Sequence, residues 1–144
     1  MPKPLPITNR LLAVLDTRAE ADAAVEALTR TSVTAAEVTL LHGEEGGSRL
    51  AAGRRAGGRW ARTLRALSFM AVDQAVDLAW YEAALADGRA VVMVHAADAE
   101  RRAQAIAALR RSGAHFMNHY GRFATEDVAP WRGAPPAVPW THHR

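Results

Sequence analysis

Cysteine is absent from the 144 residues, and this absence excludes several classes of site. Disulfide scaffolds, thiol nucleophiles, iron–sulfur clusters and cysteine-ligated zinc all need the missing side chain. Aromatic residues are also scarce, at 6% of the chain. No apolar run approaches the roughly 20 residues of a membrane-spanning helix, and the first ten residues lack the apolar core of a signal peptide. We therefore expect a cytoplasmic protein with no membrane span.

The composition that remains is typical of one globular domain, with 49% hydrophobic and 23% charged residues. The net charge is only +3, but the charges are unevenly distributed. Residues 49–67 carry six arginines and no acid, whereas residues 68–88 carry four acids and no base. Arginine supplies 17 of the 18 basic residues, a bias that is weak evidence for a nucleic-acid partner, and we do not expect one.

Short apolar runs alternate with amphipathic segments along the chain. Thr17 and Glu20 have the spacing of a helix capping box. Asp98 is placed to cap a later helix, and Gly113 to end it. The expected strands are residues 11–15, 38–42, 90–94 and 114–124, and the expected helices are residues 18–30, 59–86 and 99–112.

Two βαβ units in series predict an α+β fold, a ferredoxin-like split βαβ sandwich. Its four-stranded antiparallel sheet has the order 4-1-3-2, with a helical insertion over about 44–88 between strands 2 and 3. Residues 1–128 form this single domain, and residues 129–144 form a Pro- and Trp-rich extended tail that docks on it. Two helices leave one sheet face bare, so we expect the insertion or a second subunit to cover it.

Several segments resemble the bacterial general-stress (heat-induced stress) protein family of small ferredoxin-like domains. The likeness covers roughly residues 11–128: a βαβ opening with a short acidic helix, a Gly-rich segment before the insertion helix, the stretch YEAALADGRAVVMV from Tyr81, and the pair Gly113-Ala114 after the last helix. The arginines of the insertion depart from the family's small apolar residues there. The resemblance implies a stress-associated role and carries over no catalytic residue.

Four residues are candidates for binding a metal ion or haem. If the ends of strands 1 and 3 and the start of strand 4 share one sheet edge, Asp16, His95 and His115 come together there. Strict alternation along strand 4 would also place His115 and His119 on one face, where they suit haem or a divalent metal. Ordinary helix-capping or hydrogen-bonded side chains are the alternative.

The arginine-rich stretch is a candidate anion-binding or nucleic-acid-binding site. A basic membrane-surface helix and a solvated or inter-subunit face are alternatives, and few aromatic residues are interleaved with the arginines as a single-stranded nucleic-acid groove requires. The candidate residues are Arg54, Arg55, Arg59, Arg62 and Arg65.

A near-heptad apolar stripe along the insertion helix is a candidate oligomer interface. Its arginines precede its acids, the reverse of the order that the helix dipole favours. An antiparallel partner would pair the two halves, so we expect a homodimer or a multiple of dimers. The interface residues are Trp60, Leu64, Leu67, Ala71, Leu78 and Leu85.

These observations favour a non-enzymatic, oligomeric, stress-associated or regulatory module whose ligand is unknown. No serine lies in a nucleophile-elbow motif, and we assign no catalytic residue. The alternatives are a haem or divalent-metal domain that uses the strand-end histidines, and an anion or nucleic-acid binder that uses the insertion.

Overall fold

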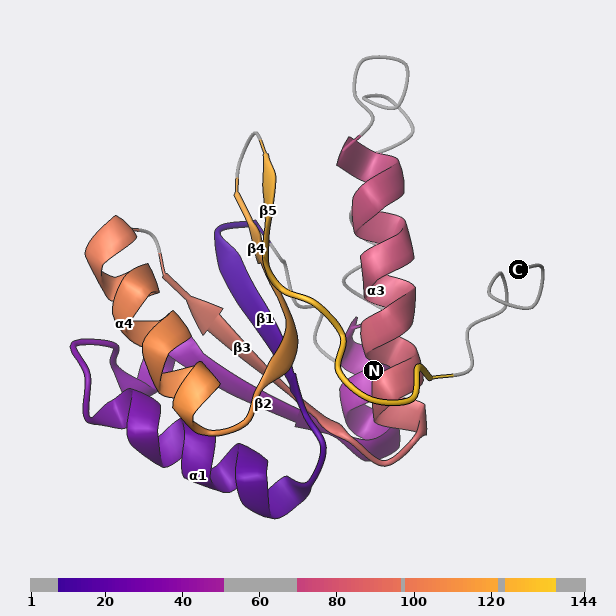
Figure 1. Cartoon of the computed structure of the whole chain (residues 1–144), viewed down its shortest axis with the longest axis horizontal. Coiled ribbons are helices and arrows are strands. Elements are labelled where there is room, and N and C mark those ends of the chain that lie inside the picture. Colours follow the sequence, from indigo (N-terminus) through magenta and orange to yellow (C-terminus); the bar gives the residue numbers. More distant parts are fainter. Residues whose placement is uncertain (1–7, 51–69, 97, 122–123, 137–144) are drawn as a thin grey trace.

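A computed structural model describes residues 8–50, 70–96, 98–121 and 124–136. These residues form an α+β fold around a five-stranded antiparallel sheet of order β2-β3-β1-β4-β5 (Figure 1). The strands are β1 (Arg10–Leu15), β2 (Val38–His42), β3 (Ala90–His95), β4 (His115–Tyr120) and β5 (Thr125–Ala129). The helical segments are α1 (Arg18–Thr29), the short 3-10 helix η1 (Ala35–Glu37), residues 43–50, α3 (Met70–Ala86) and α4 (Ala99–Arg111).

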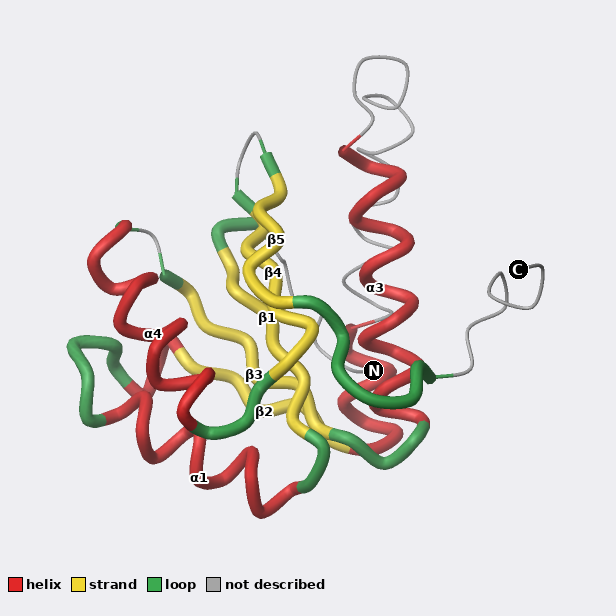
Figure 2. The backbone as a smooth tube through the Cα atoms, in the orientation of Figure 1, coloured by secondary structure: helices red, strands yellow, loops and turns green. Residues whose placement is uncertain are grey.

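The central strand β1 divides the core into two layers. Leu11, Ala13 and Leu15 face α1 and α4, whereas Leu12 and Val14 face α3. All five side chains are fully buried, which explains why this run is continuously apolar rather than alternating. The two layers are visible in Figure 2, with α1 and α4 on one side of the sheet and α3 on the other. The insertion thus supplies the cover that the second sheet face required.

Local signals place the helix ends. Thr17 caps α1 by accepting a hydrogen bond from the Glu20 amide at 3.0 Å, although the Glu20 carboxylate accepts from the Thr17 hydroxyl rather than completing a capping box. Asp98 caps α4 in the same way, accepting from the Arg101 amide at 2.8 Å. Gly113 follows α4 with φ at +89°, a conformation that favours glycine.

The predicted sheet of four strands in the order 4-1-3-2 is wrong in the number of strands, and therefore in the order. The segment expected as one strand over 114–124 ends at Tyr120, and β5 returns beside β4 as an added edge strand. Residues Thr125 to Asp127 are polar and mostly exposed, so β5 lacks the apolar pattern from which a strand is predicted. The expected boundary between domain and tail at 128/129 falls inside this strand.

A bulge interrupts the pairing of β1 with β4. Leu12 pairs with Asn118 and Val14 with His115, so two residues of β4 stand opposite Ala13. Phe116, one of the two, has φ at +43°, which is uncommon for a residue other than glycine. Side chains therefore do not alternate regularly along β4.

The predicted interface stripe falls partly within the chain's own core. Leu78 and Leu85 are 4% and 2% exposed and pack against β1 and β3, so they are not available for a surface seam. Trp60, Leu64 and Leu67 lie outside the described residues, as does the side chain of Ala71. Among the helices of the described ranges, none is long and apolar enough to cross a membrane.

Candidate functional site

A histidine and an aspartate meet at one end of the sheet. Asp16 follows the last residue of β1, and His115 is the first residue of β4. His115 Nε2 lies 2.7 Å from Asp16 Oδ1, and Arg89 Nε donates to the same oxygen at 3.0 Å. Burial alone would raise the pKa of Asp16, but the hydrogen bonds from His115 and Arg89 outweigh it and hold this pKa below its ordinary value.

The second nitrogen of His115 is also engaged. The backbone N–H of Arg132 donates to His115 Nδ1 at 3.1 Å, so Nδ1 carries no hydrogen and we assign the proton to Nε2. The imidazole is 1% exposed and packs edge-on against Trp131, with ring centroids 4.7 Å apart. The pair has the composition of a general-base dyad, but no substrate reaches either nitrogen. His115 holds the chain after β5 against the sheet.

The predicted cluster of Asp16, His95 and His115 does not form. Because β1 and β3 are antiparallel, Leu15 pairs with Ala90 at the Asp16 end, whereas His95 pairs with Arg10 at the other end. The prediction treated the ends of strands 1 and 3 as neighbours, which only a parallel pair would allow.

The two histidines of β4 lie on opposite faces of the sheet, contrary to the prediction. The bulge places His115 opposite Val14, on the α3 side, while His119 stays opposite Leu11, on the α4 side. His119 is buried, with Nε2 at 3.3 Å from Nη1 of Arg102.

Burial and then the positive charge of Arg102 lower the pKa of His119, against the opposing effects of Glu126 and a hydrogen bond with the Ala96 backbone. The neutral imidazole of His119 is already engaged by the Arg102 guanidinium and by the Ala96 backbone. Within the described part of the chain, no group of three or more His, Asp or Glu side chains is arranged to hold a metal ion. The candidate arginines Arg54, Arg55, Arg59, Arg62 and Arg65 lie outside the described residues.

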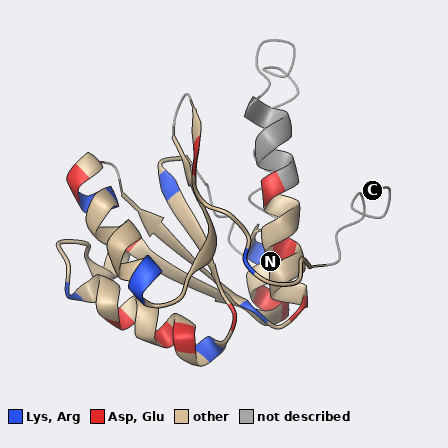
Figure 3. Cartoon of the chain, in the orientation of Figure 1, with Lys and Arg blue, Asp and Glu red and all other residues tan. Residues whose placement is uncertain are grey.

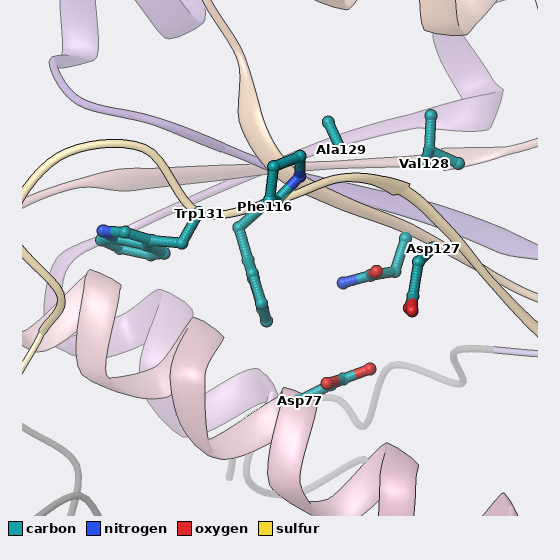
Figure 4. A pocket seen from close by; sticks show the side chains of 8 residues that line it. Asp77, Phe116, Asp127, Val128, Ala129 and Trp131 are labelled. Carbon is teal, nitrogen blue, oxygen red and sulfur yellow. The ribbon is translucent and has the colours of Figure 1, made fainter.

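The structure contains a groove that sequence reasoning missed. It lies between α3 on one side and the hairpin of β4 and β5, with the chain that follows β5, on the other (Figure 4). Its volume is about 380 Å³. The residues that line it are Asp77, Phe116, Asn118, Asp127, Val128, Ala129, Pro130 and Trp131.

The polar end of the groove has two carboxylates. Asp77 projects from α3 and Asp127 from β5, and the two side chains point toward one another in Figure 4. The hydroxyl of Tyr120 donates to Asp77 Oδ2 at 3.0 Å. The amide nitrogen of Asn118 donates to Asp127 Oδ1 at 3.1 Å, and the amide oxygen accepts from the Tyr81 hydroxyl at 3.0 Å; the opposite amide orientation would face oxygen with oxygen.

The apolar end of the groove is built from stacked rings. Phe116 stacks on Trp80 with centroids 5.4 Å apart and leans on Tyr81 at 5.0 Å. Trp131 packs against Trp80 and Phe116, at 5.5 and 5.8 Å, and lies beneath the guanidinium of Arg89 at 5.2 Å. Each ring is thus held by others from distant parts of the sequence.

A partial signal for this groove exists in the sequence. Trp131 was expected to dock, and it does: it is half-buried and its Nε1 donates to Ala134 O at 3.0 Å. The acids gave no signal, because Asp77 and Asp127 are 50 positions apart and β5 was not expected. Comparison of the chain with known protein families, with curated proteins and with solved structures finds no match.

Proposed function

We propose that the protein is a non-enzymatic regulatory module that binds a small ligand in the groove between α3 and the β4–β5 hairpin. The observation that carries this proposal is the groove itself, whose lining combines a residue of α3, residues of β4 and the continuous stretch 127–131. Its volume of about 380 Å³ falls within the usual range for small-molecule sites. A binding role fits better than catalysis because the His115 imidazole is buried and both of its nitrogens are already hydrogen-bonded.

The core of this module is, in our proposal, a ferredoxin-like sandwich with β5 added at one edge. The βαβ order of β1, α1 and β2 and of β3, α4 and β4 supports this, as does the position of both helices on one sheet face. A stress-associated role rests on the resemblance carried by the stretch from Tyr81 to Val94. Neither histidine of β4 offers a free nitrogen for haem or a metal ion, so we do not favour those alternatives.

A ligand screen that compares the wild type with a variant whose groove is blocked tests the binding role. Asp127 is exposed and points into the groove, so Asp127→Trp fills it with a large ring. Glu126 is the exposed neighbour that pairs with His119 on the other face of β5, so Glu126→Trp adds the same ring outside the groove. Cationic, neutral and anionic small molecules are screened by thermal shift against the wild type and both variants.

We expect at least one compound to raise the melting temperature of the wild type and of Glu126→Trp but not of Asp127→Trp. Binding that survives in Asp127→Trp would place the ligand elsewhere. A screen in which no compound of any charge binds the wild type would refute the proposed function.

We also propose that the protein forms homo-oligomers. The succession of an arginine-rich stretch and an acidic stretch over residues 49–88 supports antiparallel pairing. Because Leu78 and Leu85 are buried, this seam would use Trp60, Leu64 and Leu67. Light scattering at micromolar concentration tests it: a dimer that Arg62→Glu with Arg65→Glu weakens is expected, and a monomeric wild type would contradict it.

A further inference from the structure

We propose that the uptake of a proton by His115 releases the loop of residues 131–135 from the sheet, so that the fold contains a pH-sensitive switch. The loop begins with Trp131, which packs against the His115 ring. Release of the loop requires no ligand. Its consequence for the groove rests on the proposed function.

One of the two hydrogen bonds of His115 depends on a neutral imidazole. Nδ1 accepts from the backbone N–H of Arg132 at 3.1 Å, while Nε2 lies 2.7 Å from Asp16 Oδ1. An imidazolium carries a hydrogen on both nitrogens. Because a backbone N–H donates and cannot accept, a protonated Nδ1 and the Arg132 N–H would face each other as two donors. The bond from Nε2 to Asp16 is kept in both states, so protonation acts on the loop alone.

The burial of the ring makes this conflict costly. His115 is 1% exposed, so the docked loop excludes solvent from Nδ1. Loss of one buried hydrogen bond typically shifts an equilibrium by about tenfold. Movement of Arg132 away from the ring exposes both N–H groups to water, which accepts from each of them. The released loop is therefore favoured once the imidazolium forms.

The loop is built so that its release can be local. Before the loop, Pro130 O accepts from the backbone N–H of Phe116 at 2.9 Å, and after the loop Pro136 is buried. Residues 132–135 between these two ends are exposed. Gly133 lies among them with φ at +88°, and glycine has the greatest backbone freedom of any residue. The loop can open between two fixed ends without unfolding the sheet.

Charged groups of both signs occur at this end of the sheet, where β1 ends and α1 begins (Figure 3). The described elements around the ring contribute Asp16 after β1, Asp87 and Arg89 before β3, Arg132 in the loop, Glu20 of α1 beside Gly113, and the uncharged Trp80 of α3 behind Trp131. Although burial opposes it, the hydrogen bonds from His115 and Arg89 keep the pKa of Asp16 below its ordinary value, so Asp16 is ionised near neutral pH. Three acids and two arginines thus surround the ring, and this balance accommodates an imidazolium.

The other buried histidine of β4 does not hold the loop. His119 lies on the opposite face of the sheet, where its Nε2 is 3.3 Å from Nη1 of Arg102. Protonation of His119 would therefore act on its contact with α4. This difference supplies a control, because both residues are buried histidines of the same strand.

Release of the loop would remove part of the groove. Trp131 and Pro130 both line it. If the proposed function is correct, the apparent affinity of the groove falls in proportion to the fraction of molecules with a docked loop. The Kd would rise about tenfold when one molecule in ten keeps the loop docked.

NMR titration from pH 7.5 to pH 5 tests the switch, because histidine ordinarily titrates in this range. Three signals are followed: the His115 ring, the Arg132 amide and the Trp131 indole N–H. Trp131→Phe identifies the indole signal among the four tryptophans. We expect the three signals to move together, with the ratio of docked to released loop falling by about tenfold or more. Unchanged amide signals of β3 would show that the sheet stays folded.

Two substitutions of His115 separate its two hydrogen bonds. His115→Asn keeps an acceptor near the position of Nδ1 and cannot titrate, so we expect the Arg132 and Trp131 signals to stay at their docked positions at both pH values. The longer side chain of His115→Gln reaches toward Asp16 and leaves the Arg132 N–H without its acceptor. We expect the released signals in His115→Gln already at pH 7.5.

Several outcomes would overturn the switch. The Arg132 and Trp131 signals could stay fixed while the His115 ring titrates, or the ring could fail to titrate above pH 5. Movement that persists in His115→Asn, or that disappears in His119→Gln, would assign the transition to another group. No ligand is used in these measurements. The switch and the proposed function can therefore fail separately, since the ligand screen alone decides whether the groove binds a small molecule.

Discussion

His115 Nε2 donates a hydrogen bond to Asp16 Oδ1 at 2.7 Å, although 99 positions separate the two residues. The bond joins the start of β4 to the end of β1, while His115 Nδ1 accepts from the Arg132 amide. One buried imidazole thus connects two central strands with the segment that carries Trp131. The wall of the groove depends on this connection.

Replacement of His115 tests its structural role. We expect His115→Ala to lower the free energy of unfolding by about 2–4 kcal/mol, because it removes a buried side chain and leaves the Arg132 amide without its acceptor. His115→Asn retains an acceptor near Nδ1 and should lose less. Urea denaturation measures both. His42→Ala, at an exposed histidine of β2, is the control and should change the free energy by under about 0.5 kcal/mol; equal losses at His42 and His115 would contradict the role.

The lowered pKa of Asp16 predicts a specific loss of stability in acid. The unfolded chain binds a proton at Asp16 near the ordinary value of 3.8, whereas the folded chain binds it only at lower pH. The stabilisation is therefore complete above pH 3.8 and disappears as the pH falls through the folded value. Urea midpoints measured from pH 5 to pH 2 should fall more steeply for the wild type than for Asp16→Asn. Parallel curves would show that the contacts of Asp16 with His115 and Arg89 do not stabilise the folded state.

The imidazole of His119 should titrate below its ordinary value of 6.5. Two variants test the cause, measured by NMR titration of the ring. Arg102→Gln removes a positive neighbour and should raise the pKa, whereas Glu126→Gln removes a negative neighbour and should lower it further. A pKa above 6.5 in the wild type, or shifts of the opposite sign in the variants, would contradict the assignment.

The same titration has a consequence for stability near neutral pH. Below pH 6.5 the unfolded state binds a proton at His119 that the folded state does not yet bind. The free energy of unfolding should therefore fall as the pH drops from 6.5 toward the folded value, and then level off. His119→Gln should remove this dependence, and urea titrations at pH 7, 6 and 5 compare the two proteins.

Trp131 provides a test of docking by the chain after β5. Trp131→Ala should lower the free energy of unfolding by about 1–3 kcal/mol, because a half-buried indole with three aromatic neighbours is lost. Trp131→Phe keeps a ring but removes the donor to Ala134 O, so its loss should be near 1 kcal/mol. Thermal denaturation and the emission wavelength of the remaining tryptophans check both; an unchanged transition in Trp131→Ala would show that the segment is not held.

Much of the fold could be predicted from the sequence because the residue patterns that specify it are local. The buried run of β1, the caps at Thr17 and Asp98, and Gly113 after α4 each depend on neighbours a few residues away. β5 escaped prediction because its polar residues pair through the backbone with β4, and backbone pairing leaves no side-chain pattern.

The candidate site was harder to predict from the sequence because it depends on the direction and register of strand pairing. Asp16 and His115 were both singled out and do meet, but His95 lies at the opposite end of the sheet because its strand runs antiparallel to β1. His115 and His119 were assigned to one face because side chains alternate along a regular strand. A single bulge beside Ala13 reverses that inference.

Element type and helix ends follow from residue patterns alone, since hydrogen bonds within a turn and apolar periodicity are properties of short segments. Three features were decided only when the chain folded: the position of Asp77 and Asp127 in one groove, the opposite faces of His115 and His119, and the docking site of Trp131. These depend on strand direction, on one extra residue in a ladder and on contacts between segments far apart in sequence. None of them changes the local pattern of the residues involved, so only the packed structure distinguishes them from their alternatives.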